Sequence, residues 1–383
     1  MNETIYMPVG EVCSSISDTY REKKNMVTLI NTSDVLEGRV LNHERVPNSN
    51  LKGQFKKTFQ RDDILYSEIR PQNRRFAYVD FSPIDYIAST KLMVIRAKKD
   101  VVSPKYLYYF LKNSSTVAEL QLLAETRSGT FPQITFSEVA NLTIPVPPLA
   151  VQEVIVQTMQ CLEDKTICNE QINDNLADLL QTIYQERFGN DILAVNQGVL
   201  SDICSYSRDK VAVSELNVIT YFSTENMLSG KAGSTEATSL PTTSQTTACH
   251  KGDTLISNIR PYFKKIVYCE DKCGCSTDVL CFTPSQPCYS AYLFSTLYAD
   301  KFFAFMVAGS KGTKMPRGDK QQIMTYPVVL PSEEELAGFN TIASPLLEQI
   351  YSNRAENKRL SILRDTLLPK LMSGEINVSA VQL

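Results

Sequence analysis

The sequence predicts an α+β protein in which two similar globular α/β domains are joined by two long antiparallel coiled-coil helices, related by pseudo-two-fold symmetry. Two observations lead to this prediction. A series of short motifs occurs twice in the same order, with the copies about 190 residues apart. Each series is followed by a proline-rich stretch and by a long segment with the apolar spacing of a coiled coil. The expected parts are globular domains at 1–148 and 190–330, spacer helices at 149–189 and 331–374, and a tail at 375–383.

The repeat is clearest in two proline-containing motifs. The stretch "DDILYSEIRPQNRR" from Asp62 returns as "GDTLISNIRPYFKK" from Gly252. Five further pairs keep the same order: "VGEVCSSISD" from Val9 with "LSDICSYSRD" from Leu200, "STKLMVI" from Ser89 with "STDVLCF" from Ser276, "SPKYLYYFL" from Ser103 with "QPCYSAYLF" from Gln286, "RSGTFP" from Arg127 with "SKGTKMP" from Ser310, and "TIPVPPL" from Thr143 with "TYPVVLP" from Thr325. A shared order at a slowly drifting offset indicates an internal duplication.

The two long segments carry apolar residues at alternating steps of three and four, which predicts a packed seam. The seam is expected at Asn169, Leu176, Leu179 and Ile183 in the first helix and at Asn353, Leu360, Leu363 and Leu367 in the second. A buried asparagine on a seam usually fixes its register. The antiparallel orientation is inferred from the duplication, because two globule-plus-helix copies close most simply about a two-fold axis.

Composition places the chain among globular proteins of the cytoplasm. No apolar run is long enough to span a membrane, and no charged-then-apolar leader is present. The ten cysteines lack the regular spacing of a small disulfide scaffold, so reduced thiols are expected. The net charge of −3 argues mildly against nucleic acid as a partner.

The distribution of charge along the chain, in contrast, is compatible with nucleic acid as a partner. Seven basic residues face three acids between Lys52 and Arg75, and five face one acid between Lys301 and Lys320. The first helical segment is acidic instead, with seven acids against two basic residues between Leu149 and Phe188. Basic loops on globules suit a DNA-binding protein. Ordinary surface lysines and a solvated helix face would explain the same pattern equally well.

The "IRP" motifs offer candidate contacts. The residue before proline is expected to be extended, so Arg70 and Arg260 should mark strand exits. Arginine can hold phosphate or guanine with two hydrogen bonds, and the amides of Gln72 and Asn73 can read adenine. The alternative is a structural corner in which the guanidinium caps backbone carbonyls. We favour that corner for the two shared arginines, and DNA contact for the variable residues that follow them.

Motifs of catalysis and metal binding are missing. Cysteines cluster at Cys269, Cys273, Cys275, Cys281 and Cys288 without the paired spacing of a zinc site, and His43 and His250 are the only histidines. The glycine turns "RSGTFP" and "SKGTKMP" can present N–H groups to phosphate or serve as plain turns. Neither a dinucleotide motif, nor a Walker A motif, nor the N-P-P-[FY] motif of adenine methylation occurs. We therefore expect no catalytic residue and no metal, which argues against a self-contained nuclease or methyltransferase.

The order of globule, helix, globule and helix resembles the specificity subunit of type I restriction–modification enzymes. The resemblance rests on "DDILYSEIRP" with "GDTLISNIRP", on "SGTFPQITFSEVANLTIPVPPL", and on "NRAENKRLSILRDTLLPKLMSGEI" near the C-terminus, and it covers nearly the whole chain. It implies that each globule is a target-recognition domain for one half of a bipartite, asymmetric sequence in double-stranded DNA. The helices would set the gap between the halves.

The resemblance also implies partners and contacts. The chain would bind two methyltransferase subunits, which carry S-adenosylmethionine and methylate adenine, and optionally an ATP-dependent restriction subunit; it would hold no cofactor itself. The expected DNA contacts are Gln72, Asn73, Arg74, Arg75, Arg127, Thr130 and Gln133 in the first domain, and Tyr262, Lys264, Lys265, Lys311, Thr313, Lys314 and Arg317 in the second. The competing hypothesis is a repeated-module scaffold that binds proteins or other ligands without DNA specificity.

Overall fold

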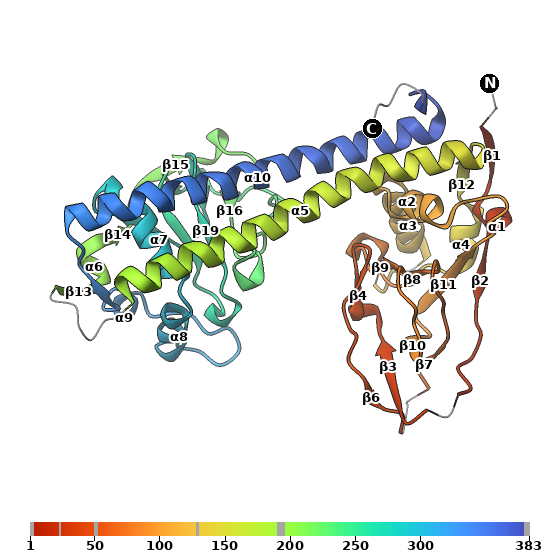
Figure 1. Cartoon of the computed structure of the whole chain (residues 1–383), viewed down its shortest axis with the longest axis horizontal. Helices are drawn as coiled ribbons and strands as arrows, with labels where there is room; N and C mark the ends of the chain where they lie inside the picture. Colours follow the sequence, from red (N-terminus) through yellow and green to blue (C-terminus); the bar gives the residue numbers. More distant parts are fainter. Residues whose placement is uncertain (1–3, 23, 50–52, 128–129, 190–195, 379–383) are drawn as a thin grey trace. The chain divides into compact units, whose positions relative to one another are not determined.

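The computed structural model describes residues 4–22, 24–49, 53–127, 130–189 and 196–378. The chain divides into two compact units, unit 1 with residues 1–166 and 357–383, and unit 2 with residues 167–356. Both boundaries fall inside the two long helices, α5 (Leu149–Phe188) and α10 (Glu333–Ser373). Each unit therefore contains one globule and one end of each helix (Figure 1).

Unit 1 is built mainly from short strands. Its strands are β1 (Ile5–Pro8), β2 (Cys13–Ile16), β3 (Met26–Ile30), β4 (Val35–Leu36), β5 (Arg39–Val40), β6 (Val46–Pro47), β7 (Phe55–Lys57), β8 (Ile64–Ser67), β9 (Phe76–Tyr78), β10 (Tyr86–Ser89), β11 (Leu92–Ala97) and β12 (Thr143–Val146). Its helices are α1 (Val9–Val12), α2 (Pro104–Lys112), α3 (Ser114–Arg127) and α4 (Phe136–Asn141), with 3-10 turns η1 (Thr32–Asp34) and η2 (Pro71–Asn73).

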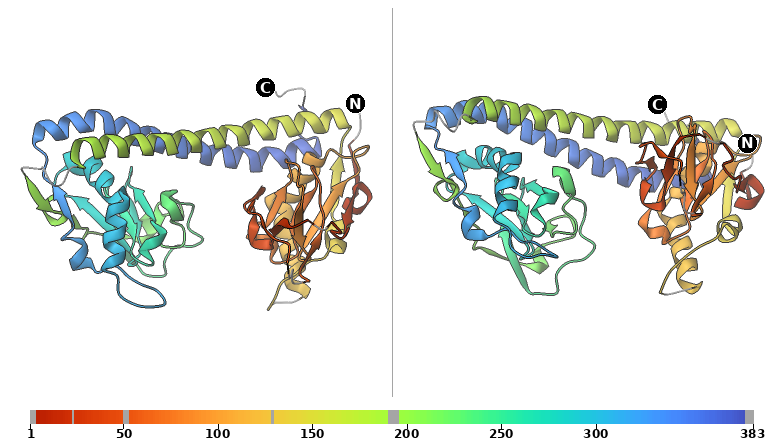
Figure 2. Two further views of the ribbon diagram at one scale, coloured as in Figure 1. Left: turned by 60° about the horizontal axis from the view of Figure 1, so that its bottom comes forward. Right: turned by 90° about the horizontal axis from the view of Figure 1, so that it is seen from below.

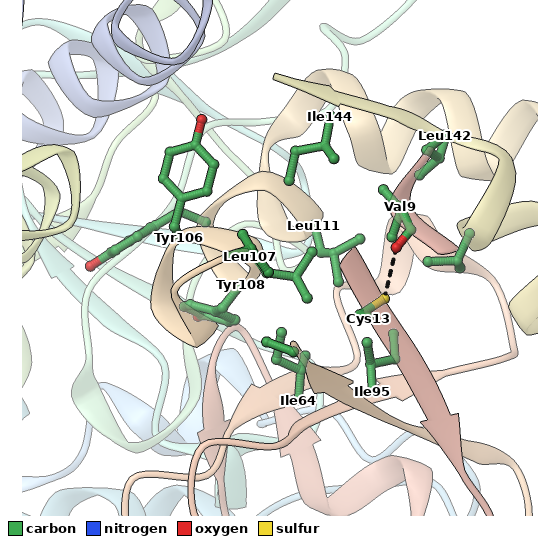
Figure 3. Close-up of a cluster of buried hydrophobic side chains, with 14 of the residues drawn as sticks. Val9, Cys13, Ile64, Ile95, Tyr106, Leu107, Tyr108, Leu111, Leu142 and Ile144 are labelled. Atoms are coloured by element: carbon green, nitrogen blue, oxygen red, sulfur yellow. Dashed lines mark hydrogen bonds between the residues drawn. The ribbon is translucent and has the colours of Figure 1, made fainter. Parts of the chain in front are cut away.

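The sheet β2-β11-β8-β9 is antiparallel and buried on both faces. Ile64 and Ile95 face a core that contains Leu107 and Leu111 of α2, as Figure 3 shows. Leu65 and Val94 alternate with them and face a second core, shared with the sheet β6-β3-β10-β7. Burial on both faces explains why the two central strands, β8 and β11, read as mainly apolar runs in the sequence.

Unit 2 contains an equivalent set of elements. Its strands are β13 (Gln197–Val199), β14 (Cys204–Tyr206), β15 (Lys210–Ala212), β16 (Tyr221–Phe222), β17 (Gln245–Cys249), β18 (Thr254–Ser257), β19 (Ile266–Tyr268), β20 (Cys273–Cys275), β21 (Val279–Pro284) and β22 (Pro327–Val329). Its helices are α6 (Leu200–Ile203), α7 (Ser290–Tyr298), α8 (Asp300–Ala308) and α9 (Lys320–Ile323), with 3-10 turns η3 (Val213–Glu215), η4 (Ser229–Lys231), η5 (Pro261–Phe263) and η6 (Pro287–Tyr289).

The strand order of one sheet confirms the duplication. The order β14-β21-β18-β19 in unit 2 matches β2-β11-β8-β9 in unit 1, strand for strand. In both units a helix lies between this sheet and α5 (Figures 1 and 2). The helix in unit 1 is α2, whose Tyr109 hydroxyl donates to Glu163 at 2.9 Å. The helix in unit 2 is α7, whose Ser295 carbonyl accepts from Gln181 at 3.0 Å.

Within each unit, the segments of α5 and α10 run antiparallel. In unit 2 the Asn353 amide donates to Asn173 at 2.9 Å, and the rings of Phe188 and Phe339 are 5.4 Å apart. Positions later in α5 thus meet positions earlier in α10. In unit 1 the Asn357 amide donates to the Thr166 carbonyl at 3.3 Å. These contacts confirm two long antiparallel helices.

The packed seam follows a different spacing from the one predicted. Asn169 and Asn353 are buried as expected, whereas Leu179 and Leu363 are 47% and 43% exposed. The predicted Leu176, Ile183, Leu360 and Leu367 are half-buried. The buried positions toward the end of α5 are Asn173, Leu180, Tyr184 and Phe188. Their steps of seven, four and four follow a helix of about 3.6 residues per turn, which drifts away from a strict heptad because its end also packs on the globule.

Some sequence predictions concern positions that are not described. Lys52 of the first basic stretch, Ser128 and Gly129 of the first glycine turn, and residues 379–383 of the tail lie outside the described residues. Within the described part of the chain, no helix combines the length and apolar character needed to cross a membrane.

Candidate nucleic-acid interface

The "IRP" motifs form the same sharp corner in both units. Arg70 and Arg260 have φ values of 45° and 50°, which are left-handed rather than the extended conformation predicted for a residue before proline. Each residue begins a 3-10 turn that its own carbonyl closes, by accepting from the backbone N–H of Asn73 or Phe263 at 2.9 Å. A non-glycine residue in this region is strained, so surrounding contacts must hold it there.

The glycine-turn segment supplies those contacts. The backbone N–H of Arg70 donates to the Pro132 carbonyl at 3.1 Å, and that of Arg260 donates to the Pro316 carbonyl at 2.8 Å. Two isolated bridges, Ile69 with Gln133 and Ile259 with Arg317, extend the pairing. We call this arrangement the corner–loop frame, defined as 69–70 with 132–133 in unit 1 and 259–260 with 316–317 in unit 2. Motifs about 60 residues apart in the sequence are thereby brought together in each unit.

The basic pairs after the corner are bound within their own units. The Arg74 Nη2 donates to Ser114 Oγ at 2.8 Å, and the Lys264 Nζ donates to Asp300 Oδ1 at 2.9 Å. Ser114 and Asp300 occupy equivalent positions, since they begin α3 and α8. Arg74 and Lys264 thus connect the corner of each unit to α3 and α8, respectively.

The second cation of each pair binds backbone carbonyls. The Arg75 Nη1 donates to the carbonyl of Ser33 at 2.9 Å, and the Lys265 Nζ donates to that of Thr224 at 2.5 Å. Burial lowers the pKa of Lys265. Carbonyl capping was expected of Arg70 and Arg260. The Arg260 Nη2 donates to the Lys314 carbonyl at 3.5 Å, whereas Arg70 is exposed and shapes the corner through its backbone. These contacts favour a structural role for Arg74, Arg75, Lys264 and Lys265 and weaken the prediction that they contact DNA.

The tips of the corners differ between the units. Gln72 and Asn73 are exposed in unit 1. Their counterparts in unit 2, Tyr262 and Phe263, are an exposed aromatic pair with ring centroids 4.8 Å apart. Large exposed aromatic side chains beside basic loops can stack on bases or wedge between base steps.

Most predicted cations of the glycine-turn segments form surface ion pairs. Arg127 pairs with Glu138 at 2.7 Å, and Lys311 pairs with Asp319 at 2.6 Å. The hydrogen bond from Lys311 holds the pKa of Asp319 below its ordinary value. Thr130, Thr313 and Lys314 are exposed. A surface cation that pairs with an exposed carboxylate can exchange that partner for a phosphate group.

Three further side chains lie against the corner–loop frame, and the sequence prediction did not include them. In unit 1 the Lys91 side chain donates to both Glu68 and Gln133. In unit 2 Asp278 pairs with Arg317. Lys91 and Asp278 hold the same position in the repeated "STKL" and "STDV" motifs. Comparing the two copies position by position was the signal that could have identified them.

A groove of about 330 Å³ opens beside Asp278 in unit 2. Its lining includes the hydroxyls of Ser223, Thr224 and Ser276 and the carboxylate of Glu225. Such a lining is rich in hydrogen-bond acceptors and carries negative charge. It therefore suits the amino groups of bases better than it suits phosphate.

The clustered cysteines of unit 2 lie inside its core. Cys249, Cys269, Cys273, Cys275 and Cys281 are buried free thiols around β17, β20 and β21, whereas Cys288 is exposed. The Sγ atoms of Cys269 and Cys273 are 3.6 Å apart. Over the residues described, no three His, Cys, Asp or Glu side chains are grouped to hold a metal ion.

Comparison with known proteins places this architecture. Residues 6–177 match the family described as type I restriction modification DNA specificity domain. The chain is 38% identical over 187 residues to the type I restriction enzyme HindI specificity subunit of Haemophilus influenzae, covering 49% of this chain and 41% of that protein. It is 34% identical over 73 residues to the type I restriction enzyme MjaIX specificity subunit of Methanocaldococcus jannaschii, covering 19% and 17%. The matches thus span less than half the length of these relatives.

Solved structures share the fold over nearly the whole chain. The S subunit of a type I restriction–modification system from M. genitalium superposes with a TM-score of 0.53 at 17% identity, covering 97% of this chain and 96% of that one. A chain from a structure of type I R-M complex assembly and conformational transition gives a TM-score of 0.52 at 16% identity, covering 97% and 98%.

Proposed function

We propose that this chain, whose residues 6–177 match the type I restriction modification DNA specificity domain, is the non-catalytic specificity subunit of a type I restriction–modification complex. Unit 1 reads one half of a bipartite, asymmetric DNA target, and unit 2 reads the other half. Helices α5 and α10 set the gap between the two halves. They also dock two methyltransferase subunits and, optionally, an ATP-dependent restriction subunit.

The observation that carries this proposal is the corner–loop frame, which occurs in both units with different side chains at its surface. The corner backbone is the same, down to the left-handed Arg70 and Arg260. The exposed tip changes from two amides to two aromatic rings. One scaffold with two sets of exposed polar and aromatic groups is what recognition of two different half-sites requires.

Chemistry on the target base is assigned to the partner. An adenine to be methylated must leave the base stack and enter an active-site pocket. S-adenosylmethionine supplies the methyl group and is expected on the methyltransferase subunits. The residues of this chain position the complex on its sequence, through base contacts at the frame and phosphate contacts from exposed cations such as Lys314.

A binding experiment tests the proposal. The full chain is assembled with the methyltransferase subunits of its own system and titrated against a pool of randomised duplexes. We expect enrichment of a bipartite sequence, with affinity that falls as salt rises because phosphate contacts release counterions. Binding without sequence preference at every salt concentration would support the scaffold hypothesis and refute this one.

A further inference from the structure

The corner–loop frame supports a three-residue polar cluster in each unit. The cluster consists of Glu68, Lys91 and Gln133 in unit 1, and of Asn258, Asp278 and Arg317 in unit 2. The positions correspond by backbone hydrogen bonding as well as by sequence. The N–H of Glu68 donates to the Lys91 carbonyl at 3.0 Å, and the N–H of Asn258 donates to the Asp278 carbonyl at 2.8 Å.

The polarity of the cluster is reversed between the units. In unit 1 the cation precedes β11, and the Lys91 Nζ contacts Glu68 Oε2 at 3.4 Å and Gln133 Oε1 at 3.2 Å. In unit 2 an acid occupies that position. The cation lies on the loop, where the Arg317 Nη2 donates to Asp278 Oδ1 at 2.9 Å. All three side-chain types differ, whereas the backbone beneath them is shared.

A role in folding does not account for this reversal. Both loops are already held by backbone hydrogen bonds to Pro132 or Pro316. The ion pairs are open to solvent, with Lys91 50% and Arg317 57% exposed, and exposed pairs add little stability. Asn258 is buried, so the variation that solvent can reach is at the positions of Lys91 with Gln133 and of Asp278 with Arg317. Variation at exposed side chains on an unchanged frame is the pattern of a recognition surface.

The chemistry of the unit 2 cluster suits a base edge. A guanidinium has a rigid fork of donors that matches the O6 and N7 acceptors of guanine. Asp278 is the sole hydrogen-bond acceptor of the Arg317 guanidinium among the described residues, so it orients the side chain and leaves further N–H donors to make contacts. The neighbouring carboxylate and the acceptor-rich groove beside it disfavour phosphate at the same place.

We propose that these clusters are specificity determinants of the two half-sites. Arg317, positioned by Asp278, reads a guanine in the half-site of unit 2, and Lys91 with Gln133 reads a different base edge in the half-site of unit 1. This inference rests on the proposed function and adds to it the residues that select the sequence.

The test transfers the unit 1 residues at two of the three cluster positions, those of Lys91 and Gln133, into unit 2. The full chain carrying Asp278→Lys and Arg317→Gln is assembled with its methyltransferase subunits, and methylated sites are mapped by sequencing randomised DNA. Preference for guanine at one position of the unit 2 half-site is expected to fall at least about tenfold, with the unit 1 half-site unchanged. The matched control is Lys272→Gln, which removes an exposed ion pair to Glu215 in the same unit and should leave both half-sites unchanged.

The possible outcomes separate this inference from the proposed function. A wild-type complex that methylates without sequence preference refutes the function itself. A selective wild-type complex whose variant keeps the same motif refutes the inference alone, as does a uniform loss of rate at unchanged base preference, which marks a phosphate contact. If the double variant does not assemble, Arg317→Met decides, because it keeps an unbranched side chain of similar length and removes every N–H donor. Retained guanine preference in Arg317→Met refutes the inference, and lost preference supports it.

Discussion

The Arg75 guanidinium donates hydrogen bonds to two backbone carbonyls, those of Ser33 and Val35. This role had been assigned to Arg70, because Arg70 is identical in the two copies whereas Arg75 is replaced by lysine. The residue that is identical in the two copies is the one whose backbone forms the corner. The cation needed only its charge and reach, which lysine also provides at Lys265.

We predict that Arg75→Met lowers the free energy of unfolding by about 1–2 kcal/mol, because two carbonyls lose a charged donor. The methylated sequence should stay unchanged. Denaturant unfolding of the full chain and methylation mapping of the complex measure the two effects. Lys56→Met, at an exposed position of β7, is the control and should alter stability by less than about 0.5 kcal/mol. If the variant keeps wild-type stability but methylates a different sequence, this prediction is wrong and Arg75 contacts DNA.

The left-handed conformation of Arg70 and Arg260 could not be predicted from local sequence. A residue before proline prefers extended geometry, and a side chain with a Cβ avoids positive φ. Here the hydrogen bonds that the backbone N–H groups donate to the Pro132 and Pro316 carbonyls override both preferences. Those partners are about 60 residues away in the chain, so only the folded structure pairs them.

At the scale of elements, the long helices were predictable and their packed stripe only partly so. Alternating apolar steps identified α5 and α10, and the bounds found, Leu149–Phe188 and Glu333–Ser373, lie close to the expected ones. A heptad pattern describes a helix that packs against one other helix. In unit 2 the end of α5 also packs on α7, where the Tyr184 hydroxyl donates to Thr296 at 3.0 Å. Packing on α7 as well as on α10 changes which residues of α5 are buried.

Two adjacent leucines test this revised seam. Leu180 is buried and Leu179 is exposed, although the predicted seam included Leu179 and not Leu180. We predict that Leu180→Ala lowers the free energy of unfolding by about 2–4 kcal/mol, through lost burial and a residual cavity. Leu179→Ala should lower it by less than about 1 kcal/mol. Chemical denaturation of the two variants gives the comparison directly, and equal losses would favour the heptad assignment.

The junction between the unit 2 corner and α8 predicts a dependence on pH. Hydrogen bonds from Lys231 and Lys264 hold the pKa of Asp300 below its ordinary value. Because the folded-state pKa is the lower one, these ion pairs stabilise the fold above the unfolded-state pKa of about 3.9. That contribution is lost as the pH falls through the folded-state value.

Asp300→Asn should therefore be less stable than the wild type at neutral pH and converge on it as the pH falls below about 4. Solvent screening of this exposed carboxylate keeps the expected difference under about 1 kcal/mol. Urea unfolding at a series of pH values measures it. Asp100→Asn, at an exposed position in unit 1, is the control and should follow the wild type throughout. A difference that is constant with pH would show that the ion pairs are not its source.

At the scale of the whole molecule, duplication is the property that made the fold predictable. Two copies of one motif series define two globules before any strand is assigned, and their shared sheet order agrees. The surface proposed to recognise DNA was harder to predict. Charge counts favoured the basic pairs after the corners, yet those cations are bound within the units. Arg317, an exposed residue of the frame, pairs with Asp278, which is distant in the sequence and close to it only in space.

The central claim is that this chain directs methylation to a bipartite sequence, one half for each unit. The most direct measurement maps methylated adenines on random-sequence DNA after treatment with the wild-type chain and its methyltransferase subunits. We expect a single asymmetric motif whose two specific halves are separated by a gap of constant length. Methylation that follows no motif, or that follows the same motif when this chain is omitted, would contradict it.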